Sequence, residues 1–215
     1  AAAMLVVVLA PGDSRADDAF ALLAANTTRL AFVKSGHADI DDMSMKGLIG
    51  LTQVLSQRTA VDAGEPMGID IETDELAFFP LLYWPVPPDA QELSATALAK
   101  IDAYLKNGGT IVFDTRDQDL AAASGEGPGG AALRRLLGGL DVPPLEPVPV
   151  EHVLTKAFYL LNDFPGRFAG GRVWVQTQGH NETGGGVNEA LGDGVSPVII
   201  GSNDWAAAWA QDEYG

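Results

Sequence analysis

Short continuous runs of apolar residues recur along the chain and are typical of strands buried in a sheet. The clearest runs lie at residues 29–34, 81–86 and 110–113. Two weaker runs, at residues 172–176 and 197–201, predict further strands in the second half of the chain. These runs are the candidate strands of a single sheet.

Helical spacing of apolar residues occurs between the runs. Residues 41–57 predict a helix that is capped by Asp41 or Ser44 and carries its apolar side chains on one face. Residues 131–137 and 205–211 predict shorter helices. The chain therefore alternates between candidate strands and candidate helices.

The clearest local signal lies at residues 94–113. Ser94 is a typical helix cap, the sequence Asn107-Gly108-Gly109 ends the helix, and a strand begins directly after it. A helix that connects two parallel strands makes a right-handed crossover. Parallel sheets built from such units are covered by helices on both faces. The predicted fold class is α/β, with a mostly parallel sheet between two helical layers (α/β/α).

The chain of 215 residues is long enough to bury one core without disulfides or metals. It has no internal repeat and no shift in composition, so residues 17–215 are predicted to form a single α/β domain with a Pro-rich connection at residues 142–149. Residues 1–16 are interpreted as an apolar leader or the remnant of a membrane helix. A buried strand is the alternative for that segment.

Charge and cysteine content narrow the possible partners. The chain carries 29 acidic and 13 basic side chains and a formal net charge of -16. Such a charge repels phosphate backbones, so we predict no nucleic-acid partner. The chain has no cysteine, which excludes a thiol nucleophile, a disulfide and a thiolate metal site. No cofactor is predicted.

Polar residues follow three of the predicted strands. In an open parallel sheet the ligand crevice lies outside the carboxyl ends of the strands. We therefore predict that the following residues gather at one rim: Ser35, His37, Asp39, Asp114, Arg116, Asp117, Asn203 and Asp204. Two roles are open for Arg116, which binds a ligand carboxylate or neutralises its acidic neighbours. Tyr83 and Trp84 either wall this crevice or belong to the core.

Other motifs give weaker signals. Residues 125–130 spell G-x-G-x-x-G, but Glu126, Pro128 and the distance from the preceding strand favour a loop over a phosphate site. Two sets of alternating polar residues could bind a hard cation but are more typical of a solvated face, and no metal site is predicted. These sets are His37, Asp39 and Asp41, and Asp70, Glu72 and Asp74.

The sequence contains no recognisable catalytic motif. It has three histidines, His37, His152 and His180, and no G-x-S-x-G elbow to present a serine. We interpret His152 as structural and His180 as a loop residue, and we assign no catalytic residue. A Ser-His-Asp site with members far apart in sequence stays open.

Several long segments resemble an uncharacterised bacterial domain family. They are ELAFFPLLYWPVPPDA, ALAKIDAYLKNGGTIVFDTRD, LRRLLGGLDVPPLEPVPVEHVLTKAFYLLNDFPGRFAGG and DGVSPVIIGSNDWAAAWAQDEYG. Members of that family often form the carboxyl-terminal part of membrane proteins with BatA-like and von Willebrand A-like regions. The family resembles class I glutamine amidotransferases (flavodoxin-like architecture) in fold. Their cysteine would fall near residues 114–117, so the resemblance implies the fold without the thioester chemistry.

The resemblance and the apolar leader together imply a domain of a bacterial membrane protein. We expect the domain to be periplasmic and attached to the membrane through segments outside it. Because no nucleophile is recognisable, we expect a non-catalytic binding or assembly domain whose partner is a protein or other domains of the same membrane protein. One alternative is a cysteine-independent hydrolase or amidase that uses strand-end Ser, His and Asp groups. Another is a calcium-stabilised structural module.

Overall fold

The computed structural model contains one seven-stranded sheet in the order β2-β1-β3-β4-β7-β6-β5. It describes residues 22, 24, 27–120, 127–140, 142, 144–156, 164, 166–177 and 196–210. The strands are β1 (Ala31–Val33), β2 (Met67–Ile69), β3 (Leu81–Pro85), β4 (Thr110–Asp114), β5 (Leu145–Pro147), β6 (Trp174–Gln176) and β7 (Val198–Gly201).

The sheet is mixed but mostly parallel. Strands β2, β1, β3, β4 and β7 pair in parallel, whereas β6 is antiparallel to both of its neighbours, β7 and β5. The predicted α/β class and mostly parallel sheet are thereby confirmed. The carboxyl ends of β1, β3, β4 and β7 lie at the same edge of the sheet, so the loops that follow them share that edge.

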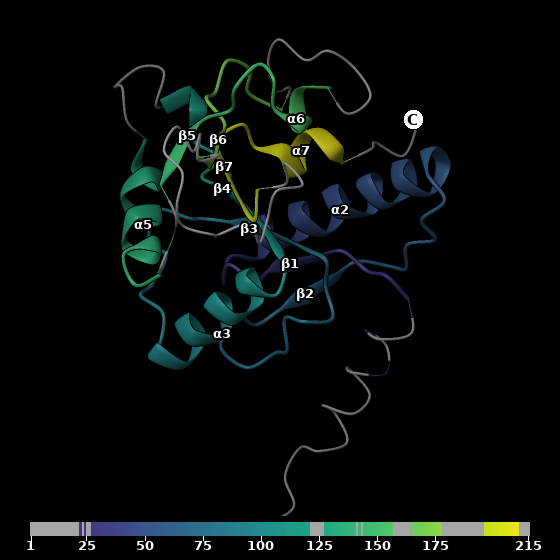
Figure 1. The fold of residues 1–215 in the computed structure, drawn as a ribbon, viewed down its shortest axis with the longest axis horizontal. Coiled ribbons are helices and arrows are strands. Elements are labelled where there is room, and N and C mark those ends of the chain that lie inside the picture. The colour runs from purple at the N-terminus through teal and green to yellow at the C-terminus, as the bar shows by residue number, and fades with distance from the viewer. Residues whose placement is uncertain are drawn as a thin grey trace, which may run out of the picture.

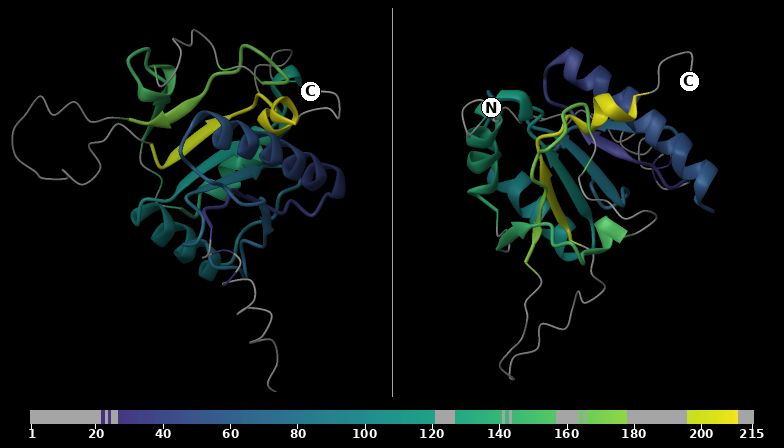
Figure 2. Two further views of the ribbon diagram at one scale, coloured as in Figure 1. Left: turned by 90° about the vertical axis from the view of Figure 1, so that its right-hand side faces the viewer. Right: turned by 90° about the horizontal axis from the view of Figure 1, so that it is seen from above.

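Helices lie on both faces of the sheet. One apolar cluster packs α3 (Ala95–Lys106) and α5 (Pro128–Leu137) against inward side chains such as Leu82 and Phe113. A second cluster packs α2 (Ala38–Arg58) and α7 (Trp205–Trp209) against the opposite side chains of the same strands. Figures 1 and 2 show α2 beside α7 on one side of the strands and α3 and α5 on the other. The short helix α6 (Val153–Lys156) lies after β5.

The segment around α3 agrees with its sequence pattern. The Ser94 hydroxyl accepts a hydrogen bond from the Ala97 amide and caps α3. The helix ends at Asn107, and Gly108 adopts a φ of +91°, a left-handed conformation that favours glycine. The chain then enters β4 directly.

The predicted start of α2 is wrong. The helix begins at Ala38, before both predicted caps, and its N-cap His37 makes no side-chain capping bond. The Asp41 carboxylate instead accepts hydrogen bonds from the Ser35 amide and hydroxyl. Ser44 lies inside the helix, where its hydroxyl donates to the Ile40 carbonyl. Asp41, in the first turn of α2, therefore holds the loop that precedes the helix and does not cap the helix.

Two edge strands and one helix start also differ from the prediction. β2 had no clear sequence signal, and β5 lies inside the predicted Pro-rich connection, since proline is tolerated at a sheet edge. α5 begins at Pro128, which suits the first position of a helix, so residues 127–130 form a helix start. The helix predicted at residues 205–211 ends at Trp209.

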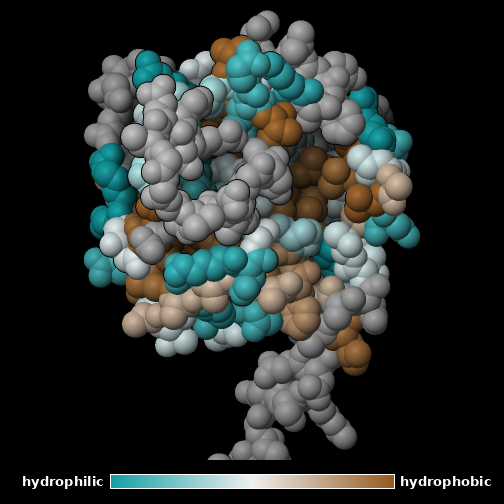
Figure 3. Space-filling model, viewed as in Figure 1, coloured by the Kyte–Doolittle hydropathy of each residue, from teal (hydrophilic) through white to brown (hydrophobic). Residues whose placement is uncertain are grey.

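On the face shown in Figure 3, hydrophilic residues form much of the described outer surface, and hydrophobic residues show mainly in recesses between them. Among the described residues, no helix is both long and apolar enough to cross a bilayer. The predicted leader at residues 1–16 and the loop histidine His180 lie outside the described residues.

Candidate functional site

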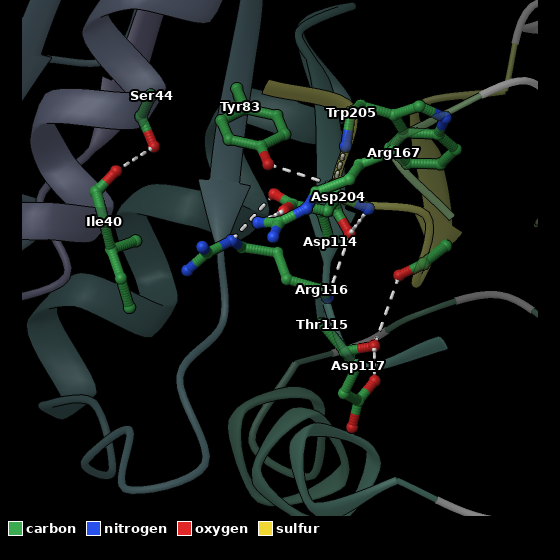
Figure 4. A network of polar contacts seen from close by, with 11 residues as sticks. Ile40, Ser44, Tyr83, Asp114, Thr115, Arg116, Asp117, Arg167, Asp204 and Trp205 are labelled. Atoms are coloured by element: carbon green, nitrogen blue, oxygen red, sulfur yellow. Dashed lines mark hydrogen bonds and ion pairs between the residues drawn. The ribbon is translucent and has the colours of Figure 1, made fainter. Parts of the chain in front are cut away.

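A buried carboxylate lies at the carboxyl end of β4. Asp114 is fully buried, and its two oxygens accept four hydrogen bonds. Oδ1 accepts from the backbone amides of Arg116 and Asp204 at 3.0 and 3.2 Å. Oδ2 accepts from the Tyr83 hydroxyl at 3.0 Å and from the Trp205 amide at 2.7 Å. Asp114 therefore joins β3, β4 and the start of α7 (Figure 4).

Burial changes the proton affinity of this group. Removal from water raises the pKa of Asp114 to about 6, although hydrogen bonds from Trp205, Tyr83, Arg116 and Asp204 favour the ionised form. Burial and the nearby Asp114 carboxylate raise the pKa of Tyr83 well above its ordinary value. The tyrosine hydroxyl therefore stays protonated and acts as the donor.

Two residues next to Asp114 have a left-handed backbone conformation. Arg116 and Asp204 have φ values of 58° and 53°, and among the described residues they are the non-glycine positions with positive φ. Their side chains form an ion pair, with Arg116 Nε 3.0 Å from Asp204 Oδ1. Arg167 Nη1 lies 3.4 Å from Asp204 Oδ2, and the Asp204 side chain is only 2% exposed. We call Asp114, Arg116, Arg167 and Asp204 the strand-end rim.

Arg116 occupies a strand-to-helix turn. β4 ends at Asp114, and residues 118–120 are helical, so the left-handed residue lies between a strand and a helix. Enzymes with a nucleophile elbow place the reacting side chain on a strained turn of this kind. Here the turn presents a guanidinium group, which can bind an anion but cannot act as a nucleophile at neutral pH.

The neighbouring residues Thr115 and Asp117 anchor α5. The Thr115 hydroxyl donates to Asp117 Oδ1 at 2.5 Å, and the Gly129 amide donates to Asp117 Oδ2 at 2.8 Å. Asp117 therefore supplies the negative charge that favours the N-terminus of this helix. The side-chain amide of Asn203 donates to the Phe164 carbonyl at 2.7 Å. Among the residues that the structure describes, its buried Oδ1 has no hydrogen-bond partner.

Ser35, His37 and Asp39 form part of a separate group. The Ser35 hydroxyl donates to Asp41 Oδ1 at 2.7 Å and accepts from the His37 amide at 3.1 Å. The His37 ring instead binds Asp89, with Nε2 3.0 Å from Oδ1. Asp39 is exposed in the first turn of α2. Within the described residues, no hydrogen bond or ion pair joins this group to the strand-end rim.

Two hollows flank these groups. A cavity of about 510 Å³ lies between α5 and strands β5 to β7 and is lined in part by Thr115 and Ser202. A cavity of about 210 Å³ lies beside the ends of β1 and β3 and is lined in part by Ser35 and Trp84. The predicted rim residues are therefore distributed over two neighbourhoods. Tyr83 and Trp84 are both buried in the core.

The alternating acidic residues make local turn contacts. Asp70 Oδ1 accepts from the Glu72 amide, and Asp74 Oδ2 accepts from the Asp70 amide. Glu72 also accepts a hydrogen bond from the Ser94 hydroxyl, which lowers its pKa. Across the part of the chain that the structure describes, no group of three His, Asp or Glu residues is placed to hold a metal ion.

His152 is buried in the turn that precedes α6, in agreement with a structural role. Its Nδ1 accepts a hydrogen bond from the Leu154 amide at 3.2 Å, so the proton of the neutral ring lies on Nε2. Burial lowers the pKa of His152.

The sequence model of a family described as a domain of unknown function (DUF4159) matches residues 29–215. The chain belongs to this family. The matched part of the chain, residues 29–215, includes all of the candidate residues described above. A search of curated proteins found no match.

Sequence reasoning missed one member of the strand-end rim, Arg167, and the hydrogen bond from Tyr83 to Asp114. Tyr83 lies within an apolar run, and nothing in that run indicates that its hydroxyl reaches the end of the next strand. Arg167 lies on a loop that is far in sequence from both β4 and β7. The available signal was the Tyr83 hydroxyl itself, because a buried tyrosine usually has a hydrogen-bond partner.

Proposed function

We propose that this DUF4159 domain is a non-catalytic binding or assembly domain, with an architecture like that of class I glutamine amidotransferases. The observation that carries the proposal is Arg116 on the turn after β4. At that place the related enzymes are expected to carry their nucleophile, and this chain carries a cation that is paired with Asp204.

The rest of the strand-end rim supports binding over catalysis. Asp114 has four donors and no exposed surface, so it is not available to exchange a proton with a bound substrate. The Arg167 side chain is 60% exposed, and the Arg116 side chain is 21% exposed. Two guanidinium groups share the Asp204 carboxylate, and the more exposed of them, that of Arg167, places its positive charge at the surface of an acidic protein. Such a site suits an anionic group on a partner.

The domain is proposed to belong to a bacterial membrane protein and to lie on the periplasmic side, with the membrane attachment outside the folded part. The partner is then a periplasmic protein or another domain of the same membrane protein. External protease added to spheroplasts should cleave the natural protein within this domain. Protection of the domain until the membrane is dissolved would contradict the periplasmic location.

The hydrolase alternative has weaker support. A serine nucleophile needs a base within hydrogen-bond reach. The His37 ring contacts Asp89, and the Ser35 hydroxyl contacts Asp41 and the His37 backbone. The purified chain is expected to hydrolyse esters and release ammonia from glutamine no faster than buffer. Hydrolysis that disappears in Ser35→Ala would establish the alternative and reject the binding proposal.

Site-specific cross-linking tests the binding surface directly. A photoreactive amino acid at position 167 should give a discrete cross-linked product in cells that produce the natural protein. The same amino acid at position 46, an exposed site on α2, is the matched control. Arg116→Gln should weaken the product from position 167, because the photoreactive residue already replaces Arg167 and this substitution removes the remaining cation of the rim.

The two positions must give different results for the proposal to hold. Equal cross-linking from positions 167 and 46, or no product from position 167, would reject the strand-end rim as a binding surface. Circular dichroism of Arg116→Gln distinguishes a lost contact from a lost fold.

A further inference from the structure

The cavity between α5 and the outer strands combines apolar and cationic lining. Its volume is about 510 Å³, within the range of small-molecule sites. Leu137, Leu145 and Trp174 line it and are only partly buried, although they pack against the core. A group of partly exposed apolar side chains in one hollow is typical of a site that an apolar ligand covers.

The charged residues of this cavity have one sign. Arg134 and Arg172 line it, and its described lining contains no aspartate or glutamate. This distribution contrasts with the formal charge of -16 for the whole chain. Acidic side chains outnumber basic ones by 29 to 13, so a hollow whose described lining holds arginines and no acid favours anions against the general field of the protein.

The two hydroxyl groups that line this cavity already donate hydrogen bonds within the protein. The Thr115 hydroxyl donates to Asp117, and the Ser202 hydroxyl donates to Gln118 Oε1 at 2.6 Å. The Asp117 carboxylate also accepts a hydrogen bond from the Gly129 amide at the start of α5. Recognition of an anion in this hollow therefore depends on Arg172, and not on the helix terminus.

We propose that this cavity binds a small amphipathic carboxylate, with its apolar body against Trp174 and the leucines and its carboxylate against Arg172. A carboxylate fits because the guanidinium group donates paired hydrogen bonds to two oxygens of such a group. The inference rests on the proposed function, since it takes the domain to bind its ligand without transforming it.

Phenylbutyrate and its neutral amide, phenylbutyramide, are a matched pair of probes. We expect an NMR titration of the full chain to shift the indole N–H signal of Trp174, assigned with Trp174→Phe. The carboxylate should bind about tenfold more tightly than the amide, the ratio that one charge-assisted hydrogen bond supplies. Arg172→Gln, at an exposed position, should reduce this ratio to near one.

Lys46→Gln is the control, because it removes one positive charge from α2, on the opposite face of the sheet, and should leave the ratio unchanged. Equal affinities for the two probes, an unchanged ratio in Arg172→Gln, or no shift of Trp174 would overturn this inference. Cross-linking at position 167 would survive those results, so the proposed function could still hold. Turnover of either probe would reject the proposed function instead.

Discussion

Asp114 couples the acidity of one buried group to the stability of the domain. Burial raises its pKa from 3.8 to about 6, so between these values the folded protein binds a proton that the unfolded chain has released. This contribution to stability is complete below pH 3.8 and is lost as the pH rises through about 6. A pKa difference of this size corresponds to about 3 kcal/mol.

We therefore expect the free energy of unfolding of the wild type, relative to Asp114→Asn, to fall by about 3 kcal/mol as the pH rises through this window. Urea denaturation of both proteins at several pH values measures the difference. The comparison cancels the titration of all other carboxylates. A difference that is constant with pH, or that grows as the pH rises, would contradict the assignment.

Tyr83→Phe provides an independent check on the same group. The Tyr83 hydroxyl donates to Asp114 and lowers its pKa, so removing the hydroxyl should move the pKa of Asp114 above about 6. The side-chain carboxyl carbon of Asp114 can be followed by NMR in both proteins. An unchanged titration midpoint would show that the hydrogen bond does not control this carboxylate.

At the residue scale, sequence reasoning located the rim but not its internal contacts. Asp114, Arg116 and Asp204 could be singled out because each follows a predicted strand. Their pairing could not be predicted, because it depends on β4 and β7 being neighbours although 83 residues separate Asp114 from Val198. The left-handed conformations of Arg116 and Asp204 likewise have no local sequence signal.

The contact between α2 and α7 depends on one glycine. A Cβ atom at Gly47 would lie 2.4 Å from the Ala206 carbonyl oxygen and 2.6 Å from its Cα atom. Gly→Ala in a helix ordinarily stabilises a protein by about 1 kcal/mol. Here we expect Gly47→Ala to destabilise the domain, by about 1–3 kcal/mol, because the neighbouring backbone must move.

Thermal or chemical denaturation gives the sign of this change. Lys46→Ala, at the adjacent exposed position, is the control and should change stability by less than about 0.5 kcal/mol. Ala206→Gly should not rescue Gly47→Ala, since the close atoms belong to the Ala206 backbone. A stabilising Gly47→Ala would show that the two helices are not packed this closely.

At the element scale, prediction succeeded where a local pattern is complete. α3 and β4 follow from a cap, an apolar face, a glycine turn and an apolar run. β2 and β5 were missed because short edge strands that contain glycine or proline lack such a run. The antiparallel direction of β6 has no signal in the strand itself, because strand direction is set by the connections.

At the scale of the whole molecule, strand order explains why the candidate residues divide into two groups. The chain leaves β1 for α2 on one face and leaves β3 for α3 on the other. After β4 the chain continues to α5 on one face, and after β7 it continues to α7 on the other face. Polar loops thus meet at two separate points of one edge, whereas the sequence alone predicted a single rim. Crevices in open α/β sheets form at such points of divergence.

The net charge of the whole molecule opposes its folding. With a formal charge of -16, the folded protein holds its carboxylates closer together than the unfolded chain does, and their repulsion opposes folding. Raising sodium chloride from about 0.01 M to about 1 M shortens the screening length from about 30 to about 3 Å. The melting temperature at neutral pH should therefore rise with salt, most steeply at low concentration. The Arg116–Asp204 ion pair is largely buried, so salt screens it less than it screens the surface charges. Weakening of this pair at high salt should therefore not cancel the rise in melting temperature. A melting temperature that falls with salt in differential scanning calorimetry would show that attractive pairs outweigh the repulsion.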